Sequence, residues 1–115
     1  MILHPLFHWS PSSRRAAITR RGLRVNSRPT TDSVRWDRIC LSLSPSHAWV
    51  HSAAVSGERG EQWDLWQVSL NHDDHVDVMP FFGNRVGEIR VHNSIPKSRI
   101  WFVGSRAVPL RGRRW

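Results

Sequence analysis

Alternating apolar and polar residues divide the chain into short strands separated by polar turns. In one clear case Ile39, Leu41 and Leu43 point one way and smaller or polar residues the other, which is typical of a half-buried strand. Residues 76–82 fit either a short strand or a loop. The strands predicted in this way cover residues 2–9, 38–44, 63–70, 87–92 and 99–103.

Two helices are predicted from a shared start signal, a serine followed by a proline. The serine hydroxyl caps the first turn, and proline suits the first helical position. The pair at residues 10–11 starts a helix that runs to about residue 21, where Gly22 supplies the C-terminal cap. The pair at residues 44–45 starts a shorter helix. Helices first and strands later predict an α+β fold with mostly antiparallel pairing.

The composition fits one small domain. The 115 residues are 39% apolar and include 7 Trp and 4 Phe, enough for a single core. We expect this domain over residues 1–108, followed by a basic tail over residues 109–115. The only cysteine, Cys40, lies in a strand pattern and is interpreted as a packing residue. No apolar run approaches the ~20 residues of a membrane span, so we expect no membrane contact. The single cysteine and an N-terminus without the layout of a signal peptide favour the cytoplasm, and we expect a monomer.

The charge is strongly basic and unevenly spread. The formal net charge is +8, and 16 of the 17 basic residues are Arg. Because Arg binds phosphate through two parallel hydrogen bonds, this favours a polyanionic partner, although a general bias towards Arg explains it equally well. Residues 1–38 hold eight Arg and two acids. After residue 77 the only carboxylate is Glu88, which therefore has an electrostatic task or pairs with Arg90 or Arg85.

Three sequence blocks occur in an order that resembles the His, Ser and Glu motifs of the ADP-ribosyltransferase superfamily. The first is residues 6–11 (LFHWSP), followed by the predicted helix and Gly-Leu. The resemblance implies that His8 hydrogen-bonds a ribose of NAD and that Ser10 supports it. Trp9, which replaces the usual Gly, and Arg15 on the predicted helix are further candidates for the NAD site. Taken alone, the block is explained more simply by His8 as an ordinary strand residue and Ser10 as an N-cap.

The second block is residues 39–49 (ICLSLSPSHAW), an apolar strand that ends in Ser and enters a short helix. The resemblance places Ser42 and Ser44 near the nicotinamide ribose. The start of this helix carries partial positive charge, which suits phosphate. A half-buried strand with a polar outer face explains the same pattern.

The third block is residues 87–100 (GEIRVHNSIPKSRI), and it resembles the strand that carries the catalytic Glu. The resemblance implies that Glu88 holds the nicotinamide-ribose hydroxyl and stabilises the oxocarbenium-like transition state. A carboxylate suits this task because the developing charge is positive. The alternative is a surface Glu paired with a neighbouring Arg.

The resemblance implies a small ADP-ribosyltransferase-like fold, with two mostly antiparallel sheets forming a cleft for NAD. The expected activity is NAD-dependent mono-ADP-ribosyl transfer, with NAD as co-substrate and a nucleic acid or a protein as acceptor. The chain has no Tyr, so Trp66 or Phe82 would stack on the nicotinamide in its place. Two alternatives remain: an enzyme like the NAD-dependent RNA 2′-phosphotransferases, which share the second block, and a non-catalytic basic module that binds nucleic acid.

A metal site is not expected. His47 and His51 lie four residues apart, and His72 and His75 flank two Asp residues. No HExxH motif or cysteine pair completes either set. The sequence therefore predicts no bound metal.

Overall fold

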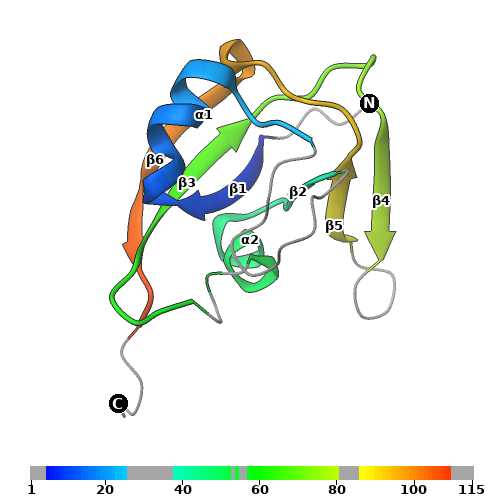
Figure 1. Ribbon diagram of the computed structural model, residues 1–115. Coiled ribbons are helices and arrows are strands. Elements are labelled where there is room, and N and C mark those ends of the chain that lie inside the picture. Colours follow the sequence, from blue (N-terminus) through cyan, green and yellow to red (C-terminus); the bar gives the residue numbers. More distant parts are fainter. Residues whose placement is uncertain (1–4, 26–37, 53, 55–56, 81–85, 110–115) are drawn as a thin grey trace.

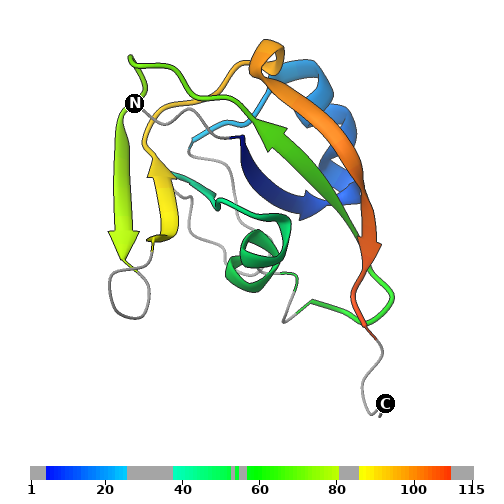
Figure 2. The same ribbon diagram turned by 180° about the vertical axis from the view of Figure 1, so that it is seen from behind.

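The computed structural model describes residues 5–25, 38–52, 54, 57–80 and 86–109, which form two antiparallel three-stranded sheets and two short helices (Figures 1 and 2). The predicted α+β class with mostly antiparallel sheets is confirmed. In spatial order, one sheet contains β1 (Leu6–Pro11), β3 (Gln62–Val68) and β6 (Ile100–Ala107). The other contains β2 (Ile39–Leu41), β5 (Val86–Val91) and β4 (Val76–Pro80). The helices are α1 (Arg15–Arg21) and α2 (Pro45–His51).

The backbones of the two sheets are joined by one bridge, between β1 and the residue that follows β2. The Phe7 amide donates to the Ser42 oxygen at 2.9 Å, and the Ser42 amide donates to the Phe7 oxygen at 3.0 Å. This bridge places β1 beside β2, so the order across both sheets is β4-β5-β2-β1-β3-β6. Within the described residues β1 and β2 pair nowhere else, so their backbones separate beyond the bridge.

Two apolar clusters hold the fold together. The larger lies under α1, whose buried residue is Ile18, and the smaller lies under α2, which contributes Ala48 and Trp49. Residues of β3 enter both clusters, so this central strand is buried on both faces. On β5, which lies in the predicted strand over residues 87–92, the apolar residues Ile89 and Val91 are buried, with 2% and 0% of their surface exposed.

The predicted helix start at Ser10 is wrong. Ser10 and Pro11 still belong to β1, residues 12–14 form a 3-10 turn, and α1 begins at Arg15. The Ser10 hydroxyl is buried and accepts a hydrogen bond from the Trp66 indole at 3.1 Å. Ser10 also pairs with Asp64 of β3, so sheet pairing outweighs the local capping preference.

The other helix boundary signals are confirmed. The Ser44 hydroxyl accepts the His47 amide at 3.1 Å, and Pro45 is the first residue of α2. Gly22 ends α1 at a φ of 82°, which favours glycine. A β-carbon at Gly22 would also collide with the backbone oxygen of Ile95. The helix therefore needs glycine at its end for both conformation and space.

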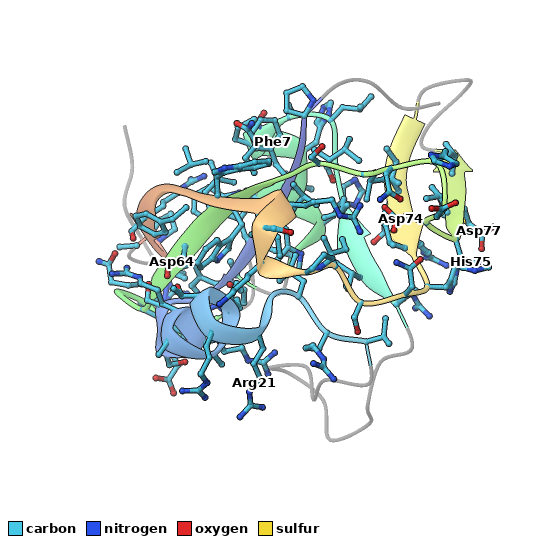
Figure 3. All side chains as sticks on the ribbon, turned by 90° about the horizontal axis from the view of Figure 1, so that it is seen from above. Phe7, Arg21, Asp64, Asp74, His75 and Asp77 are labelled. Carbon is cyan, nitrogen blue, oxygen red and sulfur yellow. The ribbon has the colours of Figure 1, made fainter. Side chains whose placement is uncertain are left out.

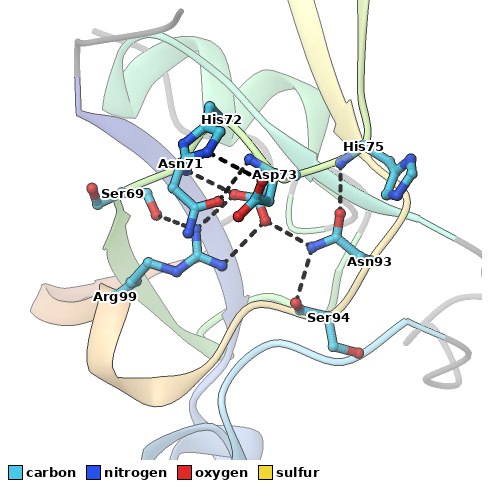
Figure 4. A network of polar contacts seen from close by, with 9 residues as sticks. Ser69, Asn71, His72, Asp73, His75, Asn93, Ser94 and Arg99 are labelled. Carbon is cyan, nitrogen blue, oxygen red and sulfur yellow. Dashed lines mark hydrogen bonds and ion pairs between the residues drawn. The ribbon is translucent and has the colours of Figure 1, made fainter.

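A polar network around Asp74 joins the turn after β3 to the turn before β6 (Figure 4). The Asp74 carboxylate accepts from Arg99 at 2.6 and 3.2 Å and from the Asn93 side chain at 2.9 Å. It also accepts the Asn71 amide at 2.9 Å. The Asp74 side chain is only 3% exposed. The hydrogen bonds, above all those from Arg99, lower the pKa of its carboxylate to about 2. The network thus ties two distant turns through one ionised carboxylate.

The chain stays attached to the domain up to the end of the described residues. Val108 is buried, and its amide donates to the Glu61 oxygen at 2.9 Å. The expected basic tail begins at Pro109, and residues 110–115 lie outside the described part of the chain. Neither helix in the described ranges has the length and apolar character needed to cross a membrane.

Candidate functional site

A pocket of about 240 Å³ opens where β1 and β2 separate. Its walls come from β1, α1 with the segment that follows it, β2 and the end of α2. Trp9 and Trp63 form an aromatic part of the wall. The polar and charged side chains that line it are His8, Ser10, Arg14, Arg21, Arg24, Arg38, Cys40, Ser42, His51 and Ser52. No Asp or Glu is among the described residues that line the pocket.

The His8 imidazole is held across the gap between the two strands. Its Nδ1 atom lies 2.9 Å from the Cys40 backbone oxygen. A carbonyl oxygen only accepts hydrogen bonds, so Nδ1 carries the proton and Nε2 is the acceptor. Burial lowers the pKa of His8 and the nearby Arg14 lowers it further, against the hydrogen bond to Cys40. His8 is therefore neutral at pH 7, with an unprotonated Nε2.

Glu88 lies one strand away from the pocket, behind Cys40. Its carboxylate accepts a hydrogen bond from Arg90 Nε at 2.9 Å and one from the Cys40 thiol. Burial raises the pKa of Glu88, but these two hydrogen bonds and the charges of Arg90 and His51 outweigh it and lower the pKa overall. The side chain is 17% exposed and ionised at neutral pH. The expected partner Arg90 is thus present.

Cys40 separates Glu88 from the pocket. Burial and the neighbouring Glu88 carboxylate raise the pKa of the Cys40 thiol to about 12. A thiol with this pKa remains protonated at pH 7 and is a poor nucleophile. This supports the interpretation of Cys40 as a packing residue.

The structure brings together four of the six predicted NAD-binding residues. His8, Trp9, Ser10 and Ser42 line the pocket, whereas Ser44 and Arg15 do not. The hydroxyl of Ser44 caps α2.

Arg15 points instead to a buried carboxylate. Its guanidinium binds Asp64 at 2.7 and 2.8 Å, and Asp64 is fully buried. Asp64 also accepts from Ser12 at 2.6 Å and from Ser105 at 2.8 Å. Burial raises the pKa of Asp64, but the hydrogen bonds from Arg15, Ser12 and Ser105 lower it overall. Asp64 thus stays ionised and joins three segments of the chain, which gives Arg15 a structural task.

The residues suggested for nicotinamide stacking differ from those at the pocket. Trp66 is 3% exposed and packs in the larger core cluster, outside the pocket wall. Phe82 lies outside the described residues. Trp9 and Trp63 are the aromatic side chains that line the pocket.

Sequence reasoning missed His51 as a residue of the pocket. His51 ends α2 and lies close enough to Glu88 for its charge to lower the pKa of that carboxylate. Arg14 lies next to His8, and burial lowers the pKa of its guanidinium. The Arg-rich composition of residues 14–38 predicts a positive surface beside the cleft, and Arg14, Arg21, Arg24 and Arg38 do line the pocket.

The described part of the chain contains no group of three or more His, Cys, Asp or Glu residues arranged to hold a metal ion. His72 and Asp73 form an exposed pair at 3.2 Å, and His92 pairs with Asp77 at 2.7 Å. Comparison of the chain with protein-family models, curated proteins and solved structures finds no significant match.

Proposed function

We propose that the protein is an NAD-dependent mono-ADP-ribosyltransferase with an ADP-ribosyltransferase-like fold. One observation carries the proposal. His8 and Ser42, from the first two motif-like blocks, line one pocket, and Glu88 from the third is hydrogen-bonded to Cys40 in the wall of that pocket. His8 of β1 and Ser42 after β2 lie where the two sheets separate, and Glu88 of β5 lies one strand behind them.

In this proposal NAD lies in the pocket with its nicotinamide ribose between β1 and β2. The unprotonated Nε2 of His8 accepts a hydrogen bond from a ribose hydroxyl, and the Ser42 hydroxyl contacts the same sugar. Trp9 and Trp63 offer apolar surface for the nicotinamide ring. The pyrophosphate carries two negative charges, which Arg14 and Arg21 at the pocket wall are suited to neutralise.

Glu88 stabilises the transition state. As the bond between ribose C1′ and the nicotinamide nitrogen breaks, its electron pair leaves with nicotinamide and positive charge develops on the ribose. The ionised Glu88 carboxylate opposes this charge. The acceptor nucleophile then bonds to C1′ and loses its proton. The thiol of Cys40 is a weak donor, so in this proposal its side chain turns aside and a ribose hydroxyl takes its place on Glu88.

The test is a calorimetric titration with NAD combined with a measurement of released nicotinamide. We expect NAD to bind and nicotinamide to be released, with release increased by a suitable acceptor. The reduced coenzyme NADH is the matched control, because it has a similar shape but its uncharged nicotinamide is a poor leaving group. Absence of NAD binding would overturn the proposal. Binding without release would leave a protein that only senses the nucleotide.

The four arginines at the pocket favour a second candidate, an enzyme like the NAD-dependent RNA 2′-phosphotransferases. Such an enzyme must bind a phosphate on its RNA substrate in addition to NAD, and Arg is suited to that task. The two candidates separate in one assay with an RNA oligonucleotide that carries an internal 2′-phosphate. Loss of that phosphate in the presence of NAD supports the second candidate, and a stable ADP-ribose adduct supports the first.

A further inference from the structure

We propose that a single-stranded nucleic acid binds across the mouth of the pocket, with its phosphates on the arginines of α1. The inference rests on the proposed function, because it names the acceptor class that such an enzyme would modify. It is carried by the charge of this surface, the exposed aromatic residue beside it and the size of the pocket.

Positive charge concentrates on α1 and its flanking residues. Residues 5–25 contain five Arg and no Asp or Glu. Asp64 neutralises only Arg15, and Arg20 and Arg21 are exposed at the end of the helix. Figure 3 shows Arg21 pointing away from the body of the protein at the end of α1.

The charge of α1 extends beyond the pocket. Arg21 lines the pocket, whereas Arg20 is exposed outside it. A polyanion that leaves the pocket along α1 contacts both. Repeated phosphates in particular match the guanidinium group, which binds them through two hydrogen bonds.

An aromatic residue continues the basic surface onto β6. Phe102 is 47% exposed, and its ring lies 4.7 Å from the Arg15 guanidinium carbon of α1. Proteins that bind single strands combine a basic surface with aromatic side chains on which bases stack. An acidic protein partner would explain the arginines but not the exposed ring. This combination therefore favours nucleic acid.

The pocket favours a single strand over a duplex. The reacting C1′ of NAD would lie inside a space of about 240 Å³, so the acceptor atom must enter it. Enzymes that modify a nucleobase act on single strands or must extrude the base, because a stacked and paired base cannot reach the site. An unpaired nucleotide of a single strand enters without that cost.

Binding is tested by fluorescence anisotropy with labelled 20-nucleotide single strands of DNA and RNA, in the absence of NAD. The variant Arg20→Gln/Arg21→Gln removes two charges and keeps good helix formers. Arg59→Gln is the control, in an exposed turn between Glu58 and Glu61. We expect the double variant to bind roughly tenfold more weakly, as for two exposed charge contacts. Its salt slope should fall by about 1.4, since each single-strand phosphate contact contributes about 0.7.

Two results overturn the inference: no binding at low salt, and a double variant that binds as well as Arg59→Gln while both melt near the wild-type temperature. Poly-glutamate that displaces the oligonucleotide at equal charge concentration also overturns it, in favour of an acidic protein. These measurements use no NAD, so they are independent of the proposed catalysis. Transfer of labelled ADP-ribose from NAD to the single strand, but not to a blunt duplex, then tests the acceptor role itself.

Discussion

The Nδ1 atom of His8 and the backbone oxygen of Cys40 lie 2.9 Å apart across the gap between β1 and β2. This bond continues the contact between the sheets beyond the Phe7–Ser42 bridge, where the backbones no longer pair. It fixes the orientation of the ring and leaves Nε2 as an acceptor in the pocket. One hydrogen bond thus joins the two sheets and sets the chemistry of the proposed ribose contact.

NAD binding is expected to weaken at acid pH through His8. Burial lowers the pKa of His8 below 6.5, so affinity should be constant near neutral pH and fall only as the pH drops through that lowered value. Protonation turns Nε2 into a donor and places a positive charge in a buried site. The same shift lowers stability, because below pH 6.5 the unfolded chain binds more protons than the folded one.

Titration calorimetry with NAD over about pH 5 to 8 measures this effect. His8→Gln should bind NAD more weakly near neutral pH and lose the acid limb that wild type shows. His92→Gln, on the surface beside Asp77, is the control and should retain the wild-type profile. An acid limb that persists in His8→Gln would assign the titration to another group.

Glu88→Gln is expected to lower the rate of nicotinamide release by about 10²–10³-fold, the usual cost of losing an electrostatic contact to a transition state. Gln is nearly isosteric, so the fold should survive and NAD affinity should change much less. The control is Asp77→Asn on the neighbouring strand β4, whose side chain is 65% exposed. The measurement compares the rate of nicotinamide release and the NAD affinity of wild type, Glu88→Gln and Asp77→Asn. Equal turnover by wild type and Glu88→Gln would remove Glu88 from the mechanism.

Asp64→Asn is expected to destabilise the fold by about 2 kcal/mol, because neutralising a buried acceptor weakens its charged hydrogen bonds. The carboxylate accepts from Ser12, Arg15 and Ser105, and it has no solvent contact to replace them. Urea unfolding monitored by tryptophan fluorescence measures the change. Glu58→Gln, at an exposed turn, should change stability by less than about 0.5 kcal/mol. A midpoint for Asp64→Asn equal to that of Glu58→Gln would show that the network contributes little.

The features that follow local rules could be predicted from the sequence. The cap at Ser44, the cap at Gly22 and the position of Glu88 on the strand face opposite Ile89 and Val91 each depend on a few neighbouring residues, and the structure has all three. Ser10 carried the same signal as Ser44, but it pairs with a strand more than 50 residues away. At Ser10, pairing with β3 overrides the local preference for a helix cap, and the sequence pattern did not show which strand would be the partner.

The arrangement around the pocket could be predicted only in part. The strand patterns located His8 and Glu88, but they did not show that β1 lies between β2 and β3. That order brings Trp63 and His51 to the pocket and directs Arg15 to Asp64. Arg15 and Asp64 lie 49 positions apart in the sequence, and an alternation of apolar and polar residues cannot show such a distant contact. Side-chain contacts that depend on the order of the strands therefore had to come from the structure.

Asp74 is expected to give the fold a stability that disappears in strong acid. The hydrogen bonds from Arg99 and its neighbours lower the pKa of Asp74 from 3.8 to about 2. The unfolded chain therefore binds the proton first as the pH falls. The contribution is fully present above pH 3.8 and is lost between there and about pH 2. Since one pKa unit corresponds to about 1.4 kcal/mol, it amounts to roughly 2 kcal/mol at neutral pH.

Urea unfolding of wild type and Asp74→Asn at a series of pH values measures this contribution. The difference in unfolding free energy should stay constant from neutral pH to about pH 5 and then shrink towards pH 2, because both proteins then carry an uncharged side chain. Asp73→Asn is the matched control, since its side chain is 80% exposed in the same turn, and it should show little difference at any pH. Figure 4 shows why the two differ: Arg99 and Asn93 converge beside the turn that holds Asp73, and both donate to Asp74. A difference for Asp74→Asn that does not change with pH would mean that its cost comes from lost packing or geometry, with no role for the charge.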